Sequence, residues 1–211
     1  MNEGGINLPV FFDNLQSIDF VLQCIAAVGA VSVPLLEEGF RLKLLEEAER
    51  SHYQPEEEVV GSGENIVRQQ MASCEVFPRE SLYLQLQQSF QGWLGRHLAA
   101  LPEYPFATPL FFDPASLQRY EPGSIGITPH RDRWRYINLV CIFIIAGSGR
   151  FYVCADRSGR DSVEIEANPG NAILMRAPGF LGSDFRPFHY VADIKDRRYS
   201  FGLRQLREKG V

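Results

Sequence analysis

The sequence has few of the residues that usually build disulfide frameworks and zinc sites. It has four cysteines, and no two of them form a C-x-x-C pair: Cys24, Cys74, Cys141 and Cys154. This spacing excludes a small disulfide-stapled scaffold. We therefore expect reduced thiols, as in a cytoplasmic protein.

Long apolar runs are also missing. No stretch approaches the roughly 18 apolar residues of a membrane-spanning helix, and the segment Met-Asn-Glu-Gly carries an acid where a secretory signal would carry Lys or Arg. We expect neither export nor membrane anchoring. The 211 residues, 45% of them hydrophobic, show no internal repeat and can bury one sizeable core, so one compact domain is expected.

Positive charge is scarce in the first half of the chain. Residues 1–108 contain 6 Lys+Arg and 15 Asp+Glu, net -9, whereas residues 109–211 contain 15 and 11, net +4. The overall charge of -5 argues against a protein that coats nucleic acid. The basic half is rich in arginine, which suits bidentate recognition of carboxylates and phosphates; a solvated arginine surface is the alternative.

The apolar pattern changes near residue 108. Before it, helical spacing predicts helices over 17–30, 35–51 and 79–101, and the polar, glycine-containing segment 53–78 could form a lid. After it, strand-like runs alternate with turn signals over 116–120, 137–146, 150–156, 162–167, 172–176, 188–194 and 198–205. This order predicts an α+β fold, in which a helical region (1–107) packs against a β-sandwich or barrel (108–211).

The chain has only four histidines, so each can be interpreted separately. His52 follows a helix in a charged stretch, which indicates a solvated helix end. His97 lies on the apolar stripe of the third helix, which indicates a packed histidine. His130 and His189 remain as candidates for chemistry.

His130-Arg-Asp132 stands between a Pro/Gly-rich approach and the most hydrophobic strand. In an extended chain, residues i and i+2 point to the same side, so the imidazole and the carboxylate would project into one cavity. A second, distant histidine would complete a two-histidine, one-carboxylate triad that leaves coordination positions open. His189, 59 residues further on, is the candidate. The motif alone also fits a surface turn.

Strand parity in the last strand places Arg198, Ser200 and Arg204 on one face. Two arginines that face a barrel interior need an anion, because burying an unpaired guanidinium costs several kcal/mol. The nearby acids Asp193 and Asp196 could supply it. A dicarboxylate cosubstrate is the other solution, because it can accept hydrogen bonds from arginine and hydroxyl groups together.

In their order, these motifs resemble those of the AlkB-like branch of the Fe(II)- and 2-oxoglutarate-dependent dioxygenases. The family's Asn-x-Tyr-x-x-Gly strand stands here as Gln118-Arg-Tyr120-Glu-Pro-Gly123, followed by His130-x-Asp132, a Pro-Gly turn at 169–170, His189 and Arg198-Tyr-Ser200-Phe-Gly-Leu-Arg204. The resemblance covers about residues 108–206. It implies a double-stranded β-helix (jelly-roll) core and Fe(II) bound by His130, Asp132 and His189.

The resemblance also implies where 2-oxoglutarate binds. Arg198 and Tyr120 would contact its far carboxylate, and Arg204 would lie near the carboxylate that chelates iron. Gln118 and Ser200 stand where the family often has Asn, so they belong to the same cosubstrate site but with altered hydrogen bonds.

The implied reaction uses O2 for oxidative hydroxylation or demethylation. AlkB-like proteins suggest an alkylated nucleobase as substrate; hydroxylation of a peptidyl side chain or a small metabolite is the alternative, and a non-catalytic jelly-roll module is a third. A run of arginines and aromatic residues after the His130 motif could line the mouth of the site: Arg131, Arg133, Trp134, Arg135 and Tyr136. An ordinary strand edge is the alternative interpretation of this run. Cupins usually show His-x-His, which this sequence lacks.

Overall fold

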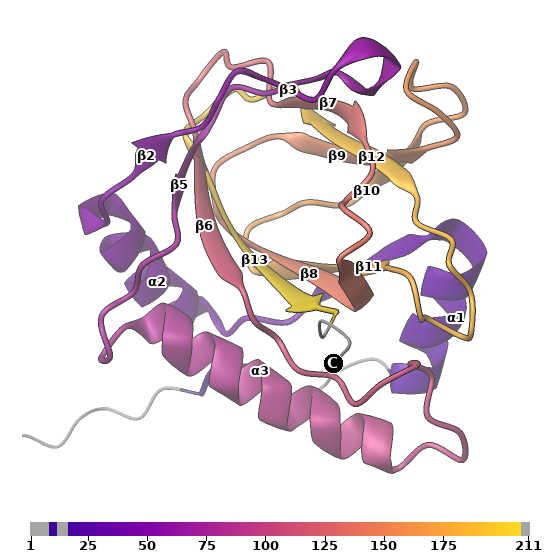
Figure 1. Ribbon diagram of the computed structural model, residues 1–211. Helices are drawn as coiled ribbons and strands as arrows, with labels where there is room; N and C mark the ends of the chain where they lie inside the picture. Colours follow the sequence, from indigo (N-terminus) through magenta and orange to yellow (C-terminus); the bar gives the residue numbers. More distant parts are fainter. Residues whose placement is uncertain (1–8, 12–16, 208–211) are drawn as a thin grey trace, which may run out of the picture.

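The structure is a computed structural model that describes residues 9–11 and 17–207. Within these it contains three α-helices, two larger antiparallel sheets that face each other and a two-stranded sheet (Figure 1). The segment 1–8, on which the expectation about export rests, lies outside the described residues. In the described part of the chain, no helix has the length and apolarity needed to cross a membrane.

The larger sheet, here called the major sheet, has seven strands in the described part of the chain. Its described strands lie side by side in the order β1 (Ala30–Pro34), β11 (Asn171–Arg176), β8 (Tyr136–Ala146), β13 (Arg198–Leu206), β6 (Ala115–Tyr120), β5 (Ala72–Cys74) and β2 (Gln54–Pro55). The minor sheet has the order β10 (Val163–Ile165), β9 (Arg150–Cys154), β12 (Phe188–Ala192) and β7 (Ile127–His130).

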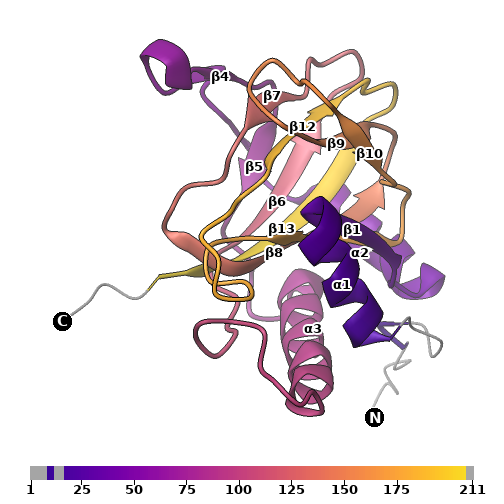
Figure 2. The ribbon, with the colours of Figure 1, turned by 90° about the vertical axis from the view of Figure 1, so that its right-hand side faces the viewer.

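The three helices cover the face of the major sheet that points away from the minor sheet. They are α1 (Ile18–Val28), α2 (Glu38–Arg50) and α3 (Leu82–Ala99). Figure 2 shows α3 below β8 and β13, with the minor sheet on the opposite side. The arrangement confirms the predicted α+β jelly-roll with packed helices.

Alternation along β8 divides the apolar core into two layers. Leu139, Cys141 and Phe143 pack toward the helices, whereas Val140 and Ile144 pack between the two sheets. Because side chains in a strand point alternately to opposite faces, one hydrophobic strand serves both layers.

The N-terminal elements differ from the predicted ones at their ends. Gly29, with a φ of 100°, ends α1, and Ala30 begins strand β1, so the predicted helix over 17–30 is too long. The second helix begins at Glu38, not at residue 35, because the Glu37 side chain caps it by accepting hydrogen bonds from the backbone N–H groups of Gly39 and Phe40.

The segment 53–78 is more ordered than a simple loop. It contributes β2 and β5 to the major sheet and also contains a hairpin of β3 (Val59–Val60) and β4 (Val67–Arg68) joined by a short 3-10 helix (Gly63–Asn65). Its role as a lid stays a prediction. Strand β7 is a further element that the Pro/Gly-rich sequence before His130 did not predict.

Candidate active site

Strand pairing in the minor sheet brings the two candidate histidines together. His130 is the last residue of β7 and pairs directly with His189 of β12, and the ring centroids lie 4.3 Å apart. Asp132 follows two residues after β7. One ligand atom from each of the three side chains lies within 4.8 Å of the other two. The structure thus assembles the three residues that the sequence pattern singled out.

Both histidines present the form that a metal needs. Nδ1 of His130 lies 2.9 Å from the carbonyl oxygen of Thr128, and Nδ1 of His189 lies 3.4 Å from that of Pro187. A carbonyl can only accept, so each Nδ1 donates a proton and Nε2 carries the lone pair. Burial lowers the pKa of His130 to about 3 and also lowers the pKa of His189, so both rings are neutral at pH 7.

The Asp132 carboxylate completes this donor set. Burial alone would raise its pKa, but nearby cationic groups, Arg204 foremost, lower it below the ordinary value. Nε of Arg204 lies 3.8 Å from one carboxylate oxygen. The other oxygen, Oδ2, is buried and has no hydrogen-bond partner among the described residues. Two neutral imidazoles and an ionised carboxylate with a free oxygen fit a divalent transition metal such as Fe(II).

A cavity of about 470 Å³ lies between the sheets and contains this triad. The predicted cosubstrate residues all line it: Gln118, Tyr120, Arg198, Ser200 and Arg204. They come from two neighbouring strands, because Arg198 pairs with Tyr120 and Ser200 pairs with Gln118 across β13 and β6. Antiparallel register therefore explains why residues about 80 positions apart share one wall.

Arg198 is the most unusual of these side chains. It is 1% exposed, and its Nε and Nη1 atoms have no hydrogen-bond partner among the described residues. Burial lowers its pKa, against the influence of Tyr120. A buried guanidinium with free N–H groups fits a carboxylate, which can accept two parallel hydrogen bonds from it.

The acids near the last strand do not satisfy Arg198. Asp193 pairs with Arg150 at 3.6 Å, and the backbone N–H of Asp196 donates to the Ser148 hydroxyl. Among the described residues, no ion pair involves Arg198. Pairing with nearby acids is therefore wrong for this arginine, whereas Arg204 does face the carboxylate of the triad.

Gln118 connects the hydroxyl groups of Tyr120 and Ser200. Its Oε1 accepts hydrogen bonds from the hydroxyls of Tyr120 at 3.5 Å and Ser200 at 3.4 Å. Both contacts are long, so these groups can exchange them for a better acceptor.

Two arginines that the sequence pattern did not place lie beside the triad. Arg157 lines the cavity, and Arg186 donates from Nη1 to the backbone carbonyl of Asp132. Arg186 is three residues before His189, but no local pattern indicates that it reaches back to Asp132. The arginine run at 131–135 forms a loop between β7 and β8, not a strand edge. His52 is exposed and His97 bonds to the Trp93 carbonyl, as expected for residues outside the site.

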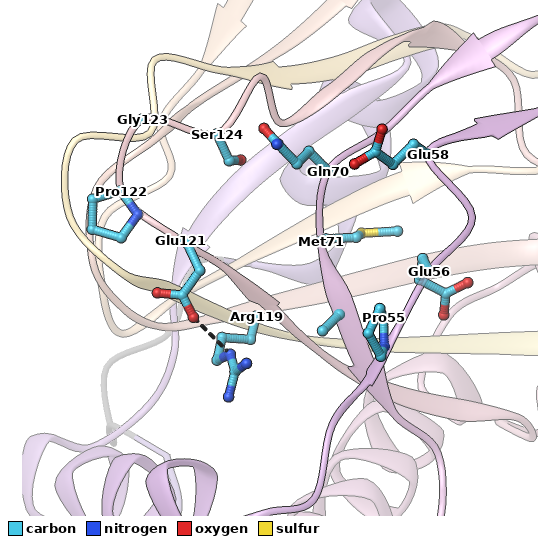
Figure 3. A pocket seen from close by; sticks show the side chains of 11 residues that line it. Pro55, Glu56, Glu58, Gln70, Met71, Arg119, Glu121, Pro122, Gly123 and Ser124 are labelled. Carbon is cyan, nitrogen blue, oxygen red and sulfur yellow. Dashed lines mark ion pairs between the residues drawn. The ribbon is translucent and has the colours of Figure 1, made fainter.

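A second hollow of about 350 Å³ lies next to the cavity and is drawn in Figure 3. It is lined by three acids, Glu56, Glu58 and Glu121, and by Arg119, whose Nε lies 3.0 Å from a carboxylate oxygen of Glu121. No residue of the triad lines it. The lining of this hollow therefore holds more acidic than basic side chains.

Three solved structures show what the chain is similar to. A prolyl hydroxylase from Trichoplax adhaerens, in complex with a peptide fragment of the hypoxia inducible factor oxygen degradation domain, matches with a TM-score of 0.67 at 12% identity, over 89% of this chain and 88% of that chain. An oxidoreductase of the 2OG-Fe(II) oxygenase family from Burkholderia pseudomallei matches with a TM-score of 0.63 at 16% identity, over 95% of both chains. The chain has the fold of the 2-oxoglutarate/Fe(II) oxygenases.

The third structure, OsALKBH1, has a TM-score of 0.58 at 12% identity and covers 84% of this chain and 98% of that chain. The fold is thus shared with prolyl hydroxylases and with an AlkB-type protein alike, and it does not single out the AlkB-like branch. No family model matches the sequence, and no curated protein matches it.

Proposed function

We propose that the protein is an Fe(II)- and 2-oxoglutarate-dependent dioxygenase that hydroxylates or demethylates its substrate with O2. The observation that carries this proposal is the pairing, in one cavity, of a neutral-histidine and carboxylate triad with a buried arginine that lacks an anion. Either feature alone would fit several kinds of binding site. Together they match the two ligands, a metal and a dicarboxylate, that this chemistry requires.

In this proposal, His130, Asp132 and His189 bind Fe(II). Arg198 and the Tyr120 hydroxyl bind the far carboxylate of 2-oxoglutarate, with Gln118 and Ser200 as hydrogen-bonding neighbours. Arg204 lies near the carboxylate that would approach the metal. Bound iron with 2-oxoglutarate supplies the oxidising chemistry, and three protein ligands leave positions open for it.

The protein's own residues would orient these ligands and exclude water. Phe151 stacks on the His189 ring at a centroid distance of 5.7 Å and fixes the ring plane. Ile142 and Val191 line the cavity with apolar surface. Phe143, the neighbour of Ile142 in β8, packs toward the helices instead. A dry wall strengthens the electrostatic interactions of the bound groups.

The substrate class has two candidates. The AlkB-like motifs favour an alkylated base for demethylation, and the prolyl hydroxylase bound to a peptide favours a peptidyl side chain. Release of succinate above the background without substrate, measured with methylated nucleotides and with peptides, would distinguish them. A non-catalytic jelly-roll would release no succinate with any substrate.

The proposal is tested by anaerobic titration of metal-free protein with Fe(II) and 2-oxoglutarate, recording the charge-transfer absorption of the chelated keto acid. We expect a band in the native protein. Asp132→Ala should abolish it, and Arg198→Ala should raise the cosubstrate concentration needed for half-saturation by about tenfold or more. Asp196→Ala, which changes an exposed acid, is the matched control. Absence of the band in the native protein would overturn the proposal.

A further inference from the structure

Four arginines line a further pocket, distinct from the hollow of Figure 3, that adjoins the cavity containing the triad (the metal cavity). This arginine pocket has a volume of about 380 Å³, and its cationic residues are Arg131, Arg133, Arg157 and Arg186. It shares Arg131, Arg133, Arg157 and the Asp132 segment with the cavity that contains the triad. A group bound in it would therefore lie next to the metal site.

The arginine pocket lacks anions of its own. None of the ion pairs among the described residues involves any of its four arginines. The acid in its lining is Asp132, which the proposed function assigns to iron. Like charges that lie together without a counter-charge repel each other, so the free site favours an anion.

Aromatic rings, not acids, position these guanidinium groups. Arg131 and Arg157 lie over the same ring of Phe188, at 4.1 and 5.6 Å from its centroid, and Arg186 lies over the ring of Trp134 at 4.0 Å. Stacking on a ring orients a guanidinium while it leaves the N–H edge free.

The free N–H groups are already positioned. Nη1 of Arg157 and Nε of Arg186 are buried without a hydrogen-bond partner among the described residues. Burial and the nearby charge of Arg131 lower the pKa of Arg186, which agrees with cations that lack a counter-charge. These unpaired N–H donors therefore favour a ligand whose acceptor atoms carry negative charge.

We infer that the arginine pocket binds a phosphate group of the primary substrate, and that this substrate is a small phosphorylated molecule, about the size of a nucleotide. The inference rests on the proposed function, because it names the substrate class of the same site. A phosphate monoester carries about -1.5 to -2 charges and three acceptor oxygens, which suits donors that converge from several elements. A single carboxylate offers less charge and only two oxygens.

The limited extent of the positive surface favours a small molecule over a polymer. Glu56 and Glu75 also line the metal cavity, and Glu58 lines the neighbouring hollow beside Glu121, which pairs with Arg119 and Arg197 (Figure 3). A long polyanion that extended beyond the arginine pocket would meet these acids. Volumes of 380 and 470 Å³ are also those of small-molecule sites, which typically span roughly 300–1,000 Å³.

The first test measures binding of inorganic phosphate to protein loaded with Mn(II) and 2-oxoglutarate, by paramagnetic relaxation of the ³¹P signal. We expect saturable binding with strong relaxation, because the pocket adjoins the triad. The double variant Arg131→Gln/Arg157→Gln should weaken binding by about tenfold or more. Arg96→Gln, which removes an exposed arginine on α3, is the matched control and should bind as the native protein does.

Calorimetry on the metal-free protein separates the two proposals. If the metal-free protein binds phosphate but does not bind added Mn(II), the proposed function fails and the phosphate site stands. If Mn(II) and 2-oxoglutarate bind but phosphate does not, or if the double variant binds phosphate as tightly as Arg96→Gln, the phosphate site is overturned. Should the double variant not fold, the single variant Arg133→Gln of an exposed pocket residue replaces it, with the same two outcomes.

Competition against inorganic phosphate then identifies the source of the phosphate. We expect a nucleoside monophosphate to compete more strongly than phosphate and acetate to compete hardly at all. A single-stranded oligonucleotide should compete no better than the monophosphate. Affinity that increases with oligonucleotide length, stronger competition by a phosphopeptide, or equal competition by acetate would each overturn the inferred substrate class.

Discussion

At the scale of single residues, Arg198 combines a structural cost with a proposed function. A buried charge without a partner destabilises a folded protein, and its replacement by an apolar side chain of similar volume is often neutral or stabilising by about 1–4 kcal/mol. Arg198 has 1% exposure and two unpartnered nitrogens, so it belongs to this class.

We therefore expect Arg198→Met to leave the free energy of unfolding of the ligand-free protein unchanged or to raise it by about 1–4 kcal/mol, while 2-oxoglutarate binding weakens by about tenfold or more, as for Arg198→Ala. Urea unfolding and a cosubstrate titration measure the two effects. Arg197→Met, at an exposed neighbour that pairs with Glu121, is the control and should not affect cosubstrate binding. Strong destabilisation by Arg198→Met would show that the protein itself satisfies this guanidinium.

Some residues of the site could be predicted because strand parity is local. The alternation that places Arg198, Ser200 and Arg204 on one face depends only on neighbouring positions in one strand. The positions of Arg157 and Arg186 depend on how separate loops pack against Phe188 and Trp134. No local pattern contains that information, so the arginine pocket emerges only from the structure.

At the scale of elements, the meeting of β7 and β12 depends on Gly126. This glycine has a φ of +73°, and a Cβ at its position would lie 2.0 Å from the carbonyl oxygen of Val191. Only a residue without a side chain allows β7 to lie this close to β12, and the same pairing places His130 against His189.

Gly126→Ala should therefore displace β7, destabilise the protein by about 1–3 kcal/mol and weaken metal binding more than a purely global loss of stability would. Gly123→Ala is a matched control, because Gly123 has a φ of +79° but its Cβ would contact nothing within 4 Å. Metal titration followed by thermal unfolding compares them. Equal effects of the two substitutions would mean that backbone strain, not the contact with β12, determines the result.

The elements that the sequence did not predict are those whose residues carry turn-like signals. Strand β7 contains Pro129 and follows glycines, and β1 begins immediately after the helix-ending Gly29. Both strands form because a partner, β12 or β11, offers hydrogen bonds from a distant part of the chain. A long apolar segment such as β8 can be predicted as a strand from its own residues, without knowledge of its partners.

At the scale of the whole molecule, the two buried histidines couple stability to pH. In the metal-free folded protein, burial lowers the pKa of His130 to about 3 and lowers that of His189, whereas an unfolded histidine titrates near 6.5. Below pH 6.5 the unfolded chain therefore binds more protons than the folded one. By linkage, the free energy of unfolding falls as the pH falls.

For the metal-free protein we expect a loss of about 2 kcal/mol from His130 between pH 6.5 and pH 5, since each proton contributes about 1.4 kcal/mol per pH unit, and a further loss in the same direction from His189. Urea unfolding at a series of pH values measures it. His189→Gln should reduce the slope, and His52→Gln, at an exposed position, should not. A native slope of zero in this range would contradict the neutral, buried form of both rings.

The strand order of the major sheet also bears on biosynthesis. β13, which follows the other described strands in the sequence, lies between β8 and β6 and pairs with both, while the edges of the sheet come from β1 and β2, which precede them. Pairings between distant segments form slowly, so a nascent chain would carry unpaired strand edges until synthesis reaches β13. The same strand carries Arg198 and Arg204. In the proposed function, a chain that has not yet reached β13 would lack the arginines for 2-oxoglutarate, so iron bound early would have no cosubstrate beside it until this strand is in place.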